Sequence, residues 1–164
     1  MLALSQTTGY AILALSCLEG RMDGWVLAKD IAACTGIPLP YLSKILHDLG
    51  ETNLIEAKRG YRGGFRLKRS ARTITLMEVA EAVEGKEWMP RCLLGLHACS
   101  DERACPSHSF WCEQRKRIES HLRETTLRDV AVFERQRGQR LNPGACQPTP
   151  HSSFDTHTAP RPEP

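Results

Sequence analysis

Residues 27–55, LAKDIAACTGIPLPYLSKILHDLGETNLI, contain two short helical patterns separated by a glycine. Leu27 and Ile31 share one face of the first pattern, and Gly36 is expected to end it with a positive φ. The second pattern has apolar residues at i, i+3, i+4 and i+7, namely Leu42, Ile45, Leu46 and Leu49. Two prolines suit its first turn, where a missing N–H costs little. Two short helices joined by a tight glycine turn predict a helix-turn-helix.

The segment that follows, residues 54–67, predicts a β-hairpin. Ile55 and Ala57 alternate on one arm and Phe65 and Leu67 on the other, around a turn rich in glycine. A helix-turn-helix followed directly by a hairpin has the element order of a winged helix.

Positive charge is concentrated on this hairpin. The chain has a net charge of only +3, yet seven of its 22 Lys and Arg residues fall within residues 58–72, without one acid. They are Lys58, Arg59, Arg62, Arg66, Lys68, Arg69 and Arg72. A run of charges is often only a solvated surface, but its place beside a helix-turn-helix favours phosphate binding.

Helical patterns are expected on both sides of the helix-turn-helix and hairpin. Upstream, one buried stripe is formed by Tyr10, Leu13, Ala14, Cys17 and Leu18, with Cys17 as a small core residue. Downstream, Thr75 and Glu78 have the spacing of a capping box at the start of a helix that Gly85 ends.

A longer helix is expected after residue 108. Its apolar seam is narrow, with Trp111, Ile118 and Leu122 at i, i+7 and i+11 and Arg115 at i+4. Such a seam favours helix pairing between subunits over packing on the same domain.

The remaining sequence predicts a short last helix and a tail. Thr126 and Asp129 have the spacing of a second capped start. From about Arg137 onward the chain is rich in proline and poor in aliphatic residues, which predicts disorder.

These patterns predict a mainly α fold, a winged helix-turn-helix DNA-binding domain with a long C-terminal dimerisation helix. The expected parts are the DNA-binding domain at residues 1–86, a cysteine-rich loop at 87–108, the dimerisation helix and a short last helix at 109–136, and a disordered tail at 137–164. The N-terminal apolar run is short and fits neither a secretion signal nor a membrane span. The chain is therefore expected in the cytoplasm, away from membranes, with its seven cysteines reduced.

The loop stretch RCLLGLHACSDERACPSHSFWC, residues 91–112, brings four cysteines and two histidines together. Structural zinc sites usually pair ligands about two to four residues apart, whereas the cysteines at 92, 99 and 105 are spaced more widely. Wide spacing on one loop suits an iron–sulfur cluster, which needs thiolates from several sides. Zinc, a thiol redox switch and plain surface cysteines remain open as alternatives.

Four segments in this order resemble the Rrf-type family of winged-helix regulators typified by IscR, NsrR, RirA and CymR. They are LSQTTGYAILAL, the helix-turn-helix block quoted above, KRGYRGGFRL with ITLMEVAEAVEG after it, and the cysteine loop, together about residues 2–135. The resemblance implies a homodimeric transcription factor without enzymatic activity. It also implies that the C-terminal helix pairs across a two-fold axis and that the loop holds an iron–sulfur cluster in the sensing members.

The resemblance further implies a ligand set, Cys92, Cys99, Cys105 and His108. IscR-like members place a histidine at this spacing, which favours [2Fe–2S] over [4Fe–4S]; NsrR-like cubane members use an aspartate where Gly9 stands here. The chain has one residue more than IscR between its first two cysteines. His97 and Cys112 are therefore competing fourth ligands, and a [4Fe–4S] form with an unidentified ligand stays open.

The main functional hypothesis is a DNA-binding regulator whose cluster senses iron, redox or nitric oxide status. The expected contacts to a palindromic duplex are Pro40, Tyr41, Ser43 and Lys44 on the second helix of the motif, and Arg59 and Arg62 on the wing. Glycines at 60, 63 and 64 are expected to let the wing approach the DNA closely. Unlike this chain, IscR-like wings carry proline and glycine at positions 61 and 62. The competing hypotheses are a regulator that uses free thiols and an iron–sulfur electron carrier, which would leave the basic wing unexplained.

Overall fold

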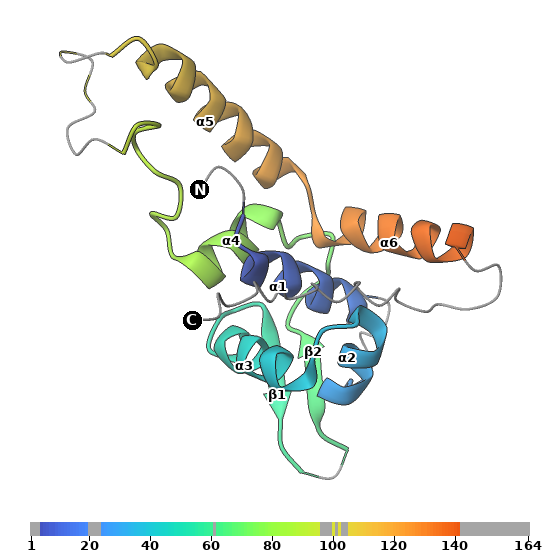
Figure 1. Ribbon diagram of the computed structural model, residues 1–164. Helices are drawn as coiled ribbons and strands as arrows, with labels where there is room; N and C mark the ends of the chain where they lie inside the picture. Colours follow the sequence, from blue (N-terminus) through green and yellow to red (C-terminus); the bar gives the residue numbers. More distant parts are fainter. Residues whose placement is uncertain are drawn as a thin grey trace, which may run out of the picture.

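The computed structural model describes residues 4–19, 24–60, 62–95, 100, 102 and 105–141. Within these residues, helices and one hairpin follow one another in the predicted order (Figure 1). They are α1 (Gln6–Cys17), α2 (Ala28–Thr35), α3 (Leu39–Gly50), β1 (Ile55–Lys58), β2 (Gly64–Leu67), α4 (Leu76–Glu84), α5 (His108–Glu124) and α6 (Leu127–Leu141). The predicted mainly α, winged-helix fold class is confirmed. None of the described helices is long and apolar enough to cross a membrane.

The helix-turn-helix is formed by α2 and α3. Gly36 ends α2 with a φ of 72°, as predicted, and its N–H donates to the carbonyl of Ala32 at 2.8 Å. α3 buries the four predicted residues Leu42, Ile45, Leu46 and Leu49. Ile31 of α2 is also fully buried, whereas Leu27 is 40% exposed. The prediction for Leu27 was wrong because this residue precedes the first turn of α2 as its N-cap.

Helix α1 lies at the centre of the domain and packs against α2, α3, α4 and α6 (Figure 1). Of the predicted stripe, Ala14 and Leu18 are buried. The other three members, Tyr10, Leu13 and Cys17, are only half-buried. The remaining buried side chains of α1 are Thr8, Ala11, Ile12, Leu15 and Ser16. A single-stripe interpretation fails here because partners surround the helix on several sides.

The predicted hairpin of the wing is confirmed, and a third segment pairs with it. Ile55 pairs with Leu67 and Ala57 with Phe65 in the antiparallel hairpin. Val26, which precedes α2, exchanges two backbone hydrogen bonds with Phe65, at 3.0 and 2.8 Å. This bridge attaches the wing to the start of the helix-turn-helix.

Two glycines of the wing are required by close backbone contacts within the chain. A Cβ at Gly63 would lie 2.2 Å from the carbonyl oxygen of Lys58. A Cβ at Gly64, whose φ is 143°, would lie 2.5 Å from the carbonyl oxygen of Val26. These glycines therefore have a role in the hairpin turn and the Val26 bridge, in addition to any role in DNA approach.

Helix α4 begins at the predicted capping box. The Thr75 hydroxyl accepts from the Glu78 N–H at 3.2 Å, and the Glu78 carboxylate accepts from the Thr75 N–H at 2.9 Å. Burial acts to raise the pKa of Glu78, but hydrogen bonds from Thr75 and Arg69 outweigh it, so this pKa lies below its usual value. The capped start of α4 thus also fixes Arg69, which lies two residues after β2.

Helix α5 projects away from the domain body and packs on α4, whereas α6 returns to pack on α1 (Figure 1). The two helices meet beside the start of α4, where the Leu127 N–H donates to the carbonyl of Ile74 at 2.9 Å. The predicted cap of α6 is confirmed, because the Asp129 carboxylate accepts from the N–H of Thr126 at 2.8 Å.

Helix α6 is longer than the sequence suggested. It continues to Leu141, so residues 137–141 are helical instead of belonging to the expected disordered tail. Its last residues, ERQRGQRL, are good helix formers except for the glycine, which explains the extension. Residues 142–164 lie outside the described part of the chain.

Candidate nucleic-acid interface and cysteine loop

The outer face of α3 carries the residues that the sequence assigned to the major groove. Pro40, Tyr41, Ser43 and Lys44 are all exposed, opposite the buried face of the helix. Lys44 makes no ion pair with any residue that the structure describes, so its charge is available to a phosphate.

Tyr41 has a second set of contacts inside the chain. Its phenolic oxygen lies 2.7 Å from the hydroxyl oxygen of Thr7 on α1. Its ring meets that of Tyr10 edge-to-face, with the centroids 5.6 Å apart. No local sequence pattern indicates this anchor, because Tyr41 is distant along the chain from Thr7 and Tyr10, which both lie on α1.

The wing tip exposes two of the predicted basic residues, Arg59 and Arg62. Arg62 has a φ of 58°, in the left-handed region that most side chains avoid, which directs the chain around the turn. Tyr61 lies outside the described residues. Both arginines therefore sit where a wing can reach a DNA groove.

Other basic residues of the wing are engaged within the chain. Arg66 pairs with Glu56 at 2.8 Å, and the ammonium of Lys68 donates to the carbonyl of Thr52 at 2.7 Å. Arg69 pairs with Glu78 at 2.6 Å. The charge run is thus divided between structural contacts and exposed side chains.

Trp25 is a wing residue that the sequence interpretation missed. The Arg66 guanidinium lies 4.7 Å from the centre of its ring, and the Lys58 ammonium lies 5.7 Å from it. Two cations close to one aromatic ring form cation–π contacts that hold Trp25 against the wing. The only sequence signal was an aromatic residue just before the bridging Val26.

The end of α4 is joined to the start of α1 through Glu84. Its carboxylate accepts hydrogen bonds from the Ser5 N–H at 2.9 Å and from the hydroxyl of the buried Thr8. Burial acts to raise the pKa of Glu84, but the hydrogen bonds from Thr8 and Ser5 outweigh it, so this pKa lies below its usual value. The carboxylate therefore caps α1 in its charged form.

The cysteine loop begins directly after α4 and ends at α5. Cys92 is 7% exposed and Cys105 is half-buried. His108 is the first residue of α5, and its N–H donates to the carbonyl of Cys105 at 2.9 Å. Cys99 and His97 lie outside the described residues. Within the described ranges, no group of three His, Cys, Asp or Glu side chains could hold a metal ion.

Cys112 lies beside the predicted ligand His108. Its sulfur is 3.6 Å from Nε2 of the histidine, one helical turn away on α5. The neighbouring Trp111 is buried, and its indole N–H donates to the carbonyl of Pro90 at 3.1 Å, which fastens the start of α5 to the loop. Thiols and an imidazole are donors that suit an iron–sulfur cluster, so the residue types fit this group. The structure therefore places the two predicted competitors for the fourth ligand, His108 and Cys112, next to each other on α5.

The apolar seam of α5 is partly used within the chain. Trp111 and Leu122 are 4% and 7% exposed, so they pack on their own domain. Phe110, by contrast, is 57% exposed. Helix pairing through α5 would therefore involve Phe110 and polar flanks more than the predicted seam.

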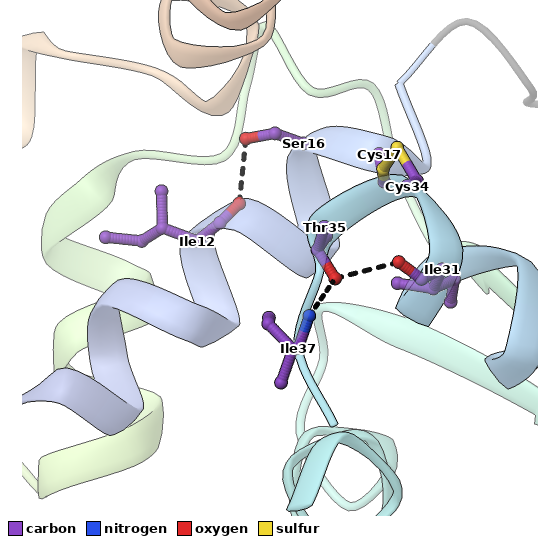
Figure 2. Close-up of a disulfide and its surroundings, with 7 residues drawn as sticks. All are labelled: Ile12, Ser16, Cys17, Ile31, Cys34, Thr35 and Ile37. Carbon is purple, nitrogen blue, oxygen red and sulfur yellow. Dashed lines mark hydrogen bonds between the residues drawn. A yellow bond between two sulfur atoms is a disulfide. The ribbon is translucent and has the colours of Figure 1, made fainter. Parts of the chain in front are cut away.

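Two cysteines outside the loop are joined in a disulfide. Cys17 at the end of α1 bonds to Cys34 near the end of α2, with 6.7 Å between their Cα atoms (Figure 2). The expectation of seven reduced cysteines is thus wrong for this pair. It was missed because their sequence separation of 17 gives no hint that two helix ends meet.

A helix-turn-helix with an exposed face on α3 and a basic wing defines a DNA-binding regulator of the winged-helix class. The Rrf2 family model, described as an iron-dependent transcriptional regulator, matches residues 4–132. The chain therefore belongs to the Rrf2 family of transcriptional regulators, as the sequence resemblance implied.

Individual relatives agree with this assignment. An HTH-type transcriptional regulator of Aquifex aeolicus is 32% identical over 132 residues, which cover 79% of this chain and 92% of the relative. The regulator IscR of Yersinia pseudotuberculosis is 32% identical over 122 residues, 74% of each chain. The structure of T. potens IscR superposes with a TM-score of 0.65 at 27% identity, covering 84% of this chain and 91% of that one. These relatives are transcriptional regulators and not enzymes.

Proposed function

We propose that this chain is a homodimeric regulator whose affinity for a palindromic DNA site depends on an iron–sulfur cluster held by the cysteine loop. The observation that carries the proposal is the position of this loop, directly after the helix that Glu84 ends. Glu84 caps α1 through Ser5 and Thr8, and α1 contacts the exposed helix α3 through Thr7 and Tyr41. A change in how well the loop is ordered can therefore be transmitted to the DNA-binding face through direct contacts.

The residues that would hold the cluster are Cys92, Cys99, Cys105 and His108, in a [2Fe–2S] form. When bound, it would supply a centre that oxidants, nitric oxide or iron shortage can alter. The chain's own contribution is to fix the two ends of the loop. Trp111 fastens one end through its hydrogen bond to Pro90, and the cap at Glu84 holds the other.

The DNA contacts would come from both parts of the winged helix. Ser43 and Tyr41 reach base edges or phosphates from α3, while Lys44 and Arg59 supply charge to the backbone. Pro40 would contact the groove wall, and Arg62 would approach the minor groove. This division predicts sequence readout by α3 and largely sequence-independent binding by the wing.

The partner subunit would be a second copy of the chain that pairs through α5. This helix projects from the domain body and leaves Phe110 exposed near its start (Figure 1). A two-fold dimer presents two α3 helices to half-sites one turn of DNA apart. The proposed parts remain a DNA-binding domain at 1–86, a cluster loop at 87–108 and a pairing helix after it.

The test is to isolate the full chain without oxygen and compare it with Cys105→Ser, His108→Ala and Cys112→Ala. Iron, sulfide and the visible and paramagnetic resonance spectra are measured for each. We expect two irons and two sulfides per chain in the wild type, loss in Cys105→Ser, an altered spectrum in His108→Ala and a wild-type spectrum in Cys112→Ala. An unchanged spectrum in His108→Ala with a changed one in Cys112→Ala would assign the fourth ligand to the cysteine. Iron-free wild-type protein would contradict the proposal and favour a regulator that uses free thiols.

A further inference from the structure

The Cys17–Cys34 bond lies in the DNA-binding domain and not in the cysteine loop. We propose that these two cysteines form a reversible oxidation site for peroxides, which rigidifies the helix-turn-helix independently of any cluster. Both residues are half-buried, so the pair is not enclosed in the core as a structural buried cysteine would be. In Figure 1 the loop that follows α4 lies on the opposite side of α1 from α2, which separates the two groups of cysteines.

The geometry favours bond formation within one chain. The Cα atoms are 6.7 Å apart, inside the range that a disulfide spans without backbone movement. Each cysteine lies in the last turn of its helix, and the two helices pack against each other. The second thiol is therefore held next to the first, which makes it an effective resolving group.

The neighbours of the pair are ordered on both sides (Figure 2). The Ser16 hydroxyl donates to the carbonyl of Ile12 at 2.7 Å within α1. The Thr35 hydroxyl donates to the carbonyl of Ile31 at 2.8 Å and accepts from the Ile37 N–H at 3.3 Å. Cys34 is thus directly joined to the residue that holds the turn between α2 and α3.

The end of α1 is fixed to a second element as well. Glu19, two residues after Cys17, forms an ion pair with Arg135 of α6. A bond from Cys17 to Cys34 therefore connects α2, and the turn after it, to the end of α1, which α6 already contacts. Reduction would remove this covalent tie between α1 and α2.

The oxidation balances with one hydrogen peroxide per disulfide. The thiolate of one cysteine attacks a peroxide oxygen, the O–O bond breaks, and hydroxide leaves and is protonated to water, giving a sulfenic acid. The thiol of the other cysteine then attacks that sulfur; the S–S bond forms, the S–O bond breaks, and a second water leaves. Two sulfurs lose two electrons in total and the peroxide gains them. A dithiol reverses the reaction by exchange, and such transient disulfides are the kind found in reducing compartments.

The expected consequence is tighter DNA binding in the oxidised form. In the bonded form Gly36 already has the left-handed φ that the turn requires, and α3 is seated on the core. If the turn is already fixed before binding, the chain loses less conformational entropy when it binds DNA. Reduction is therefore expected to weaken DNA binding by about fivefold or more.

The first experiment identifies the bond in the full wild-type chain. The protein is reduced with dithiothreitol, freed of reductant, titrated with hydrogen peroxide, alkylated and digested under non-reducing conditions. We expect the Cys17–Cys34 peptide pair to appear in the monomer at a lower peroxide dose than any other disulfide. Oxidation that instead joins either cysteine to the loop, or joins two chains through them, would overturn the proposal without touching the cluster hypothesis.

The second experiment measures the consequence in Cys34→Ser, with Cys146→Ser as the matched control that also removes one thiol. A labelled duplex is first selected from a random pool with untreated wild-type protein. Each peroxide-treated protein sample is divided in two, and one half is reduced with dithiothreitol in iron-free buffer. The affinity for the duplex and the hydrogen exchange of residues 28–37 are then measured in both halves. Wild type and Cys146→Ser should lose affinity and exchange protection on reduction, and Cys34→Ser should lose neither. An equal response in all three chains would place the effect in the loop and overturn this site. Cys17→Ser serves as a second variant if circular dichroism shows that Cys34→Ser is unfolded.

Discussion

The phenolic oxygen of Tyr41 lies 2.7 Å from the hydroxyl oxygen of Thr7, which joins the first turn of α3 to the first turn of α1. The same side chain is one that we propose for DNA contact. Tyr41 therefore has two possible roles, an anchor within the chain and a ligand of DNA. The two roles are separable because only one of them involves Thr7.

Removing the hydroxyl of Tyr41 separates these roles. Tyr41→Phe and Thr7→Val each break the hydrogen bond, and because it is solvent-exposed each should lower the free energy of unfolding by about 1 kcal/mol or less. The double variant should be no less stable than the worse single variant, since the two changes remove one shared interaction. Urea unfolding of the four chains measures this coupling.

The same four chains are then titrated with DNA. If the hydroxyl of Tyr41 acts only as an anchor, Tyr41→Phe and Thr7→Val weaken DNA binding equally. A loss confined to Tyr41→Phe would show direct contact with the duplex. Additive effects on unfolding would contradict the hydrogen bond itself.

The Glu84 cap predicts a pH dependence of stability. Its pKa in the folded chain is below the ordinary 4.5, so the charged form is favoured by folding. The stabilisation is complete at pH 7, begins to decline near the unfolded pKa, and disappears as the pH falls through the folded pKa. Glu84→Gln should therefore lower the melting temperature at pH 7, and this deficit should be smaller at pH 3.

The control for this experiment is Glu87→Gln, which changes a carboxylate that is 84% exposed and pairs only with Arg91 among the described residues. Its melting temperature should follow that of the wild type at both pH values. A loss of melting temperature in Glu84→Gln that grows as the pH falls would contradict a lowered pKa of Glu84 in the folded chain.

The glycine at position 64 is predicted to be essential for the wing. Gly64→Ala would place a Cβ 2.5 Å from the carbonyl of Val26 at a φ of 143°, so it should cost about 1–3 kcal/mol and disturb the Val26–Phe65 bridge. Gly9→Ala, in the helix α1 with no heavy atom within 4 Å of its Cβ, should instead stabilise the chain by about 0.5–1 kcal/mol. Thermal unfolding compares the two, and equal effects would refute the close approach at position 64.

The wing arginine Arg59 is predicted to contact phosphate. Arg59→Ala should weaken binding to specific and random duplexes alike and reduce the slope of log affinity against log salt by about 1. Lys86→Ala, which removes an exposed charge just after α4, should leave the slope unchanged. If Arg59→Ala weakened binding to the specific duplex alone, the result would show that Arg59 contacts bases and not phosphate.

The parts of the fold that the sequence predicted are those controlled by local rules. The turn at Gly36 and the capping box of Thr75 and Glu78 depend on residues close together in the chain. The hairpin itself followed from its two apolar arms and glycine-rich turn, although of the four apolar residues on its arms only Ile55 and Leu67 are buried, and Ala57, on the same arm as Ile55, is exposed.

Apart from the exposed N-cap Leu27 and the longer α6, the features that the sequence did not predict join distant segments. Helix α1 did not follow a single stripe because four other helices surround it. The Cys17–Cys34 bond, the Tyr41–Thr7 contact and the contacts of Trp25 with Lys58 and Arg66 depend on helices and strands meeting in space. No local pattern encodes such meetings, and they are also where the candidate DNA interface receives its support.

The central claim is that the cluster in the cysteine loop controls how the chain holds DNA. The most direct measurement is the affinity of oxygen-free wild-type protein for its selected duplex, before and after an iron chelator removes the metal, with iron and sulfide counted in each sample and dithiothreitol present throughout. The account predicts iron and sulfide in the untreated sample and an affinity that changes about tenfold when they are removed. The same affinity in both samples would contradict it.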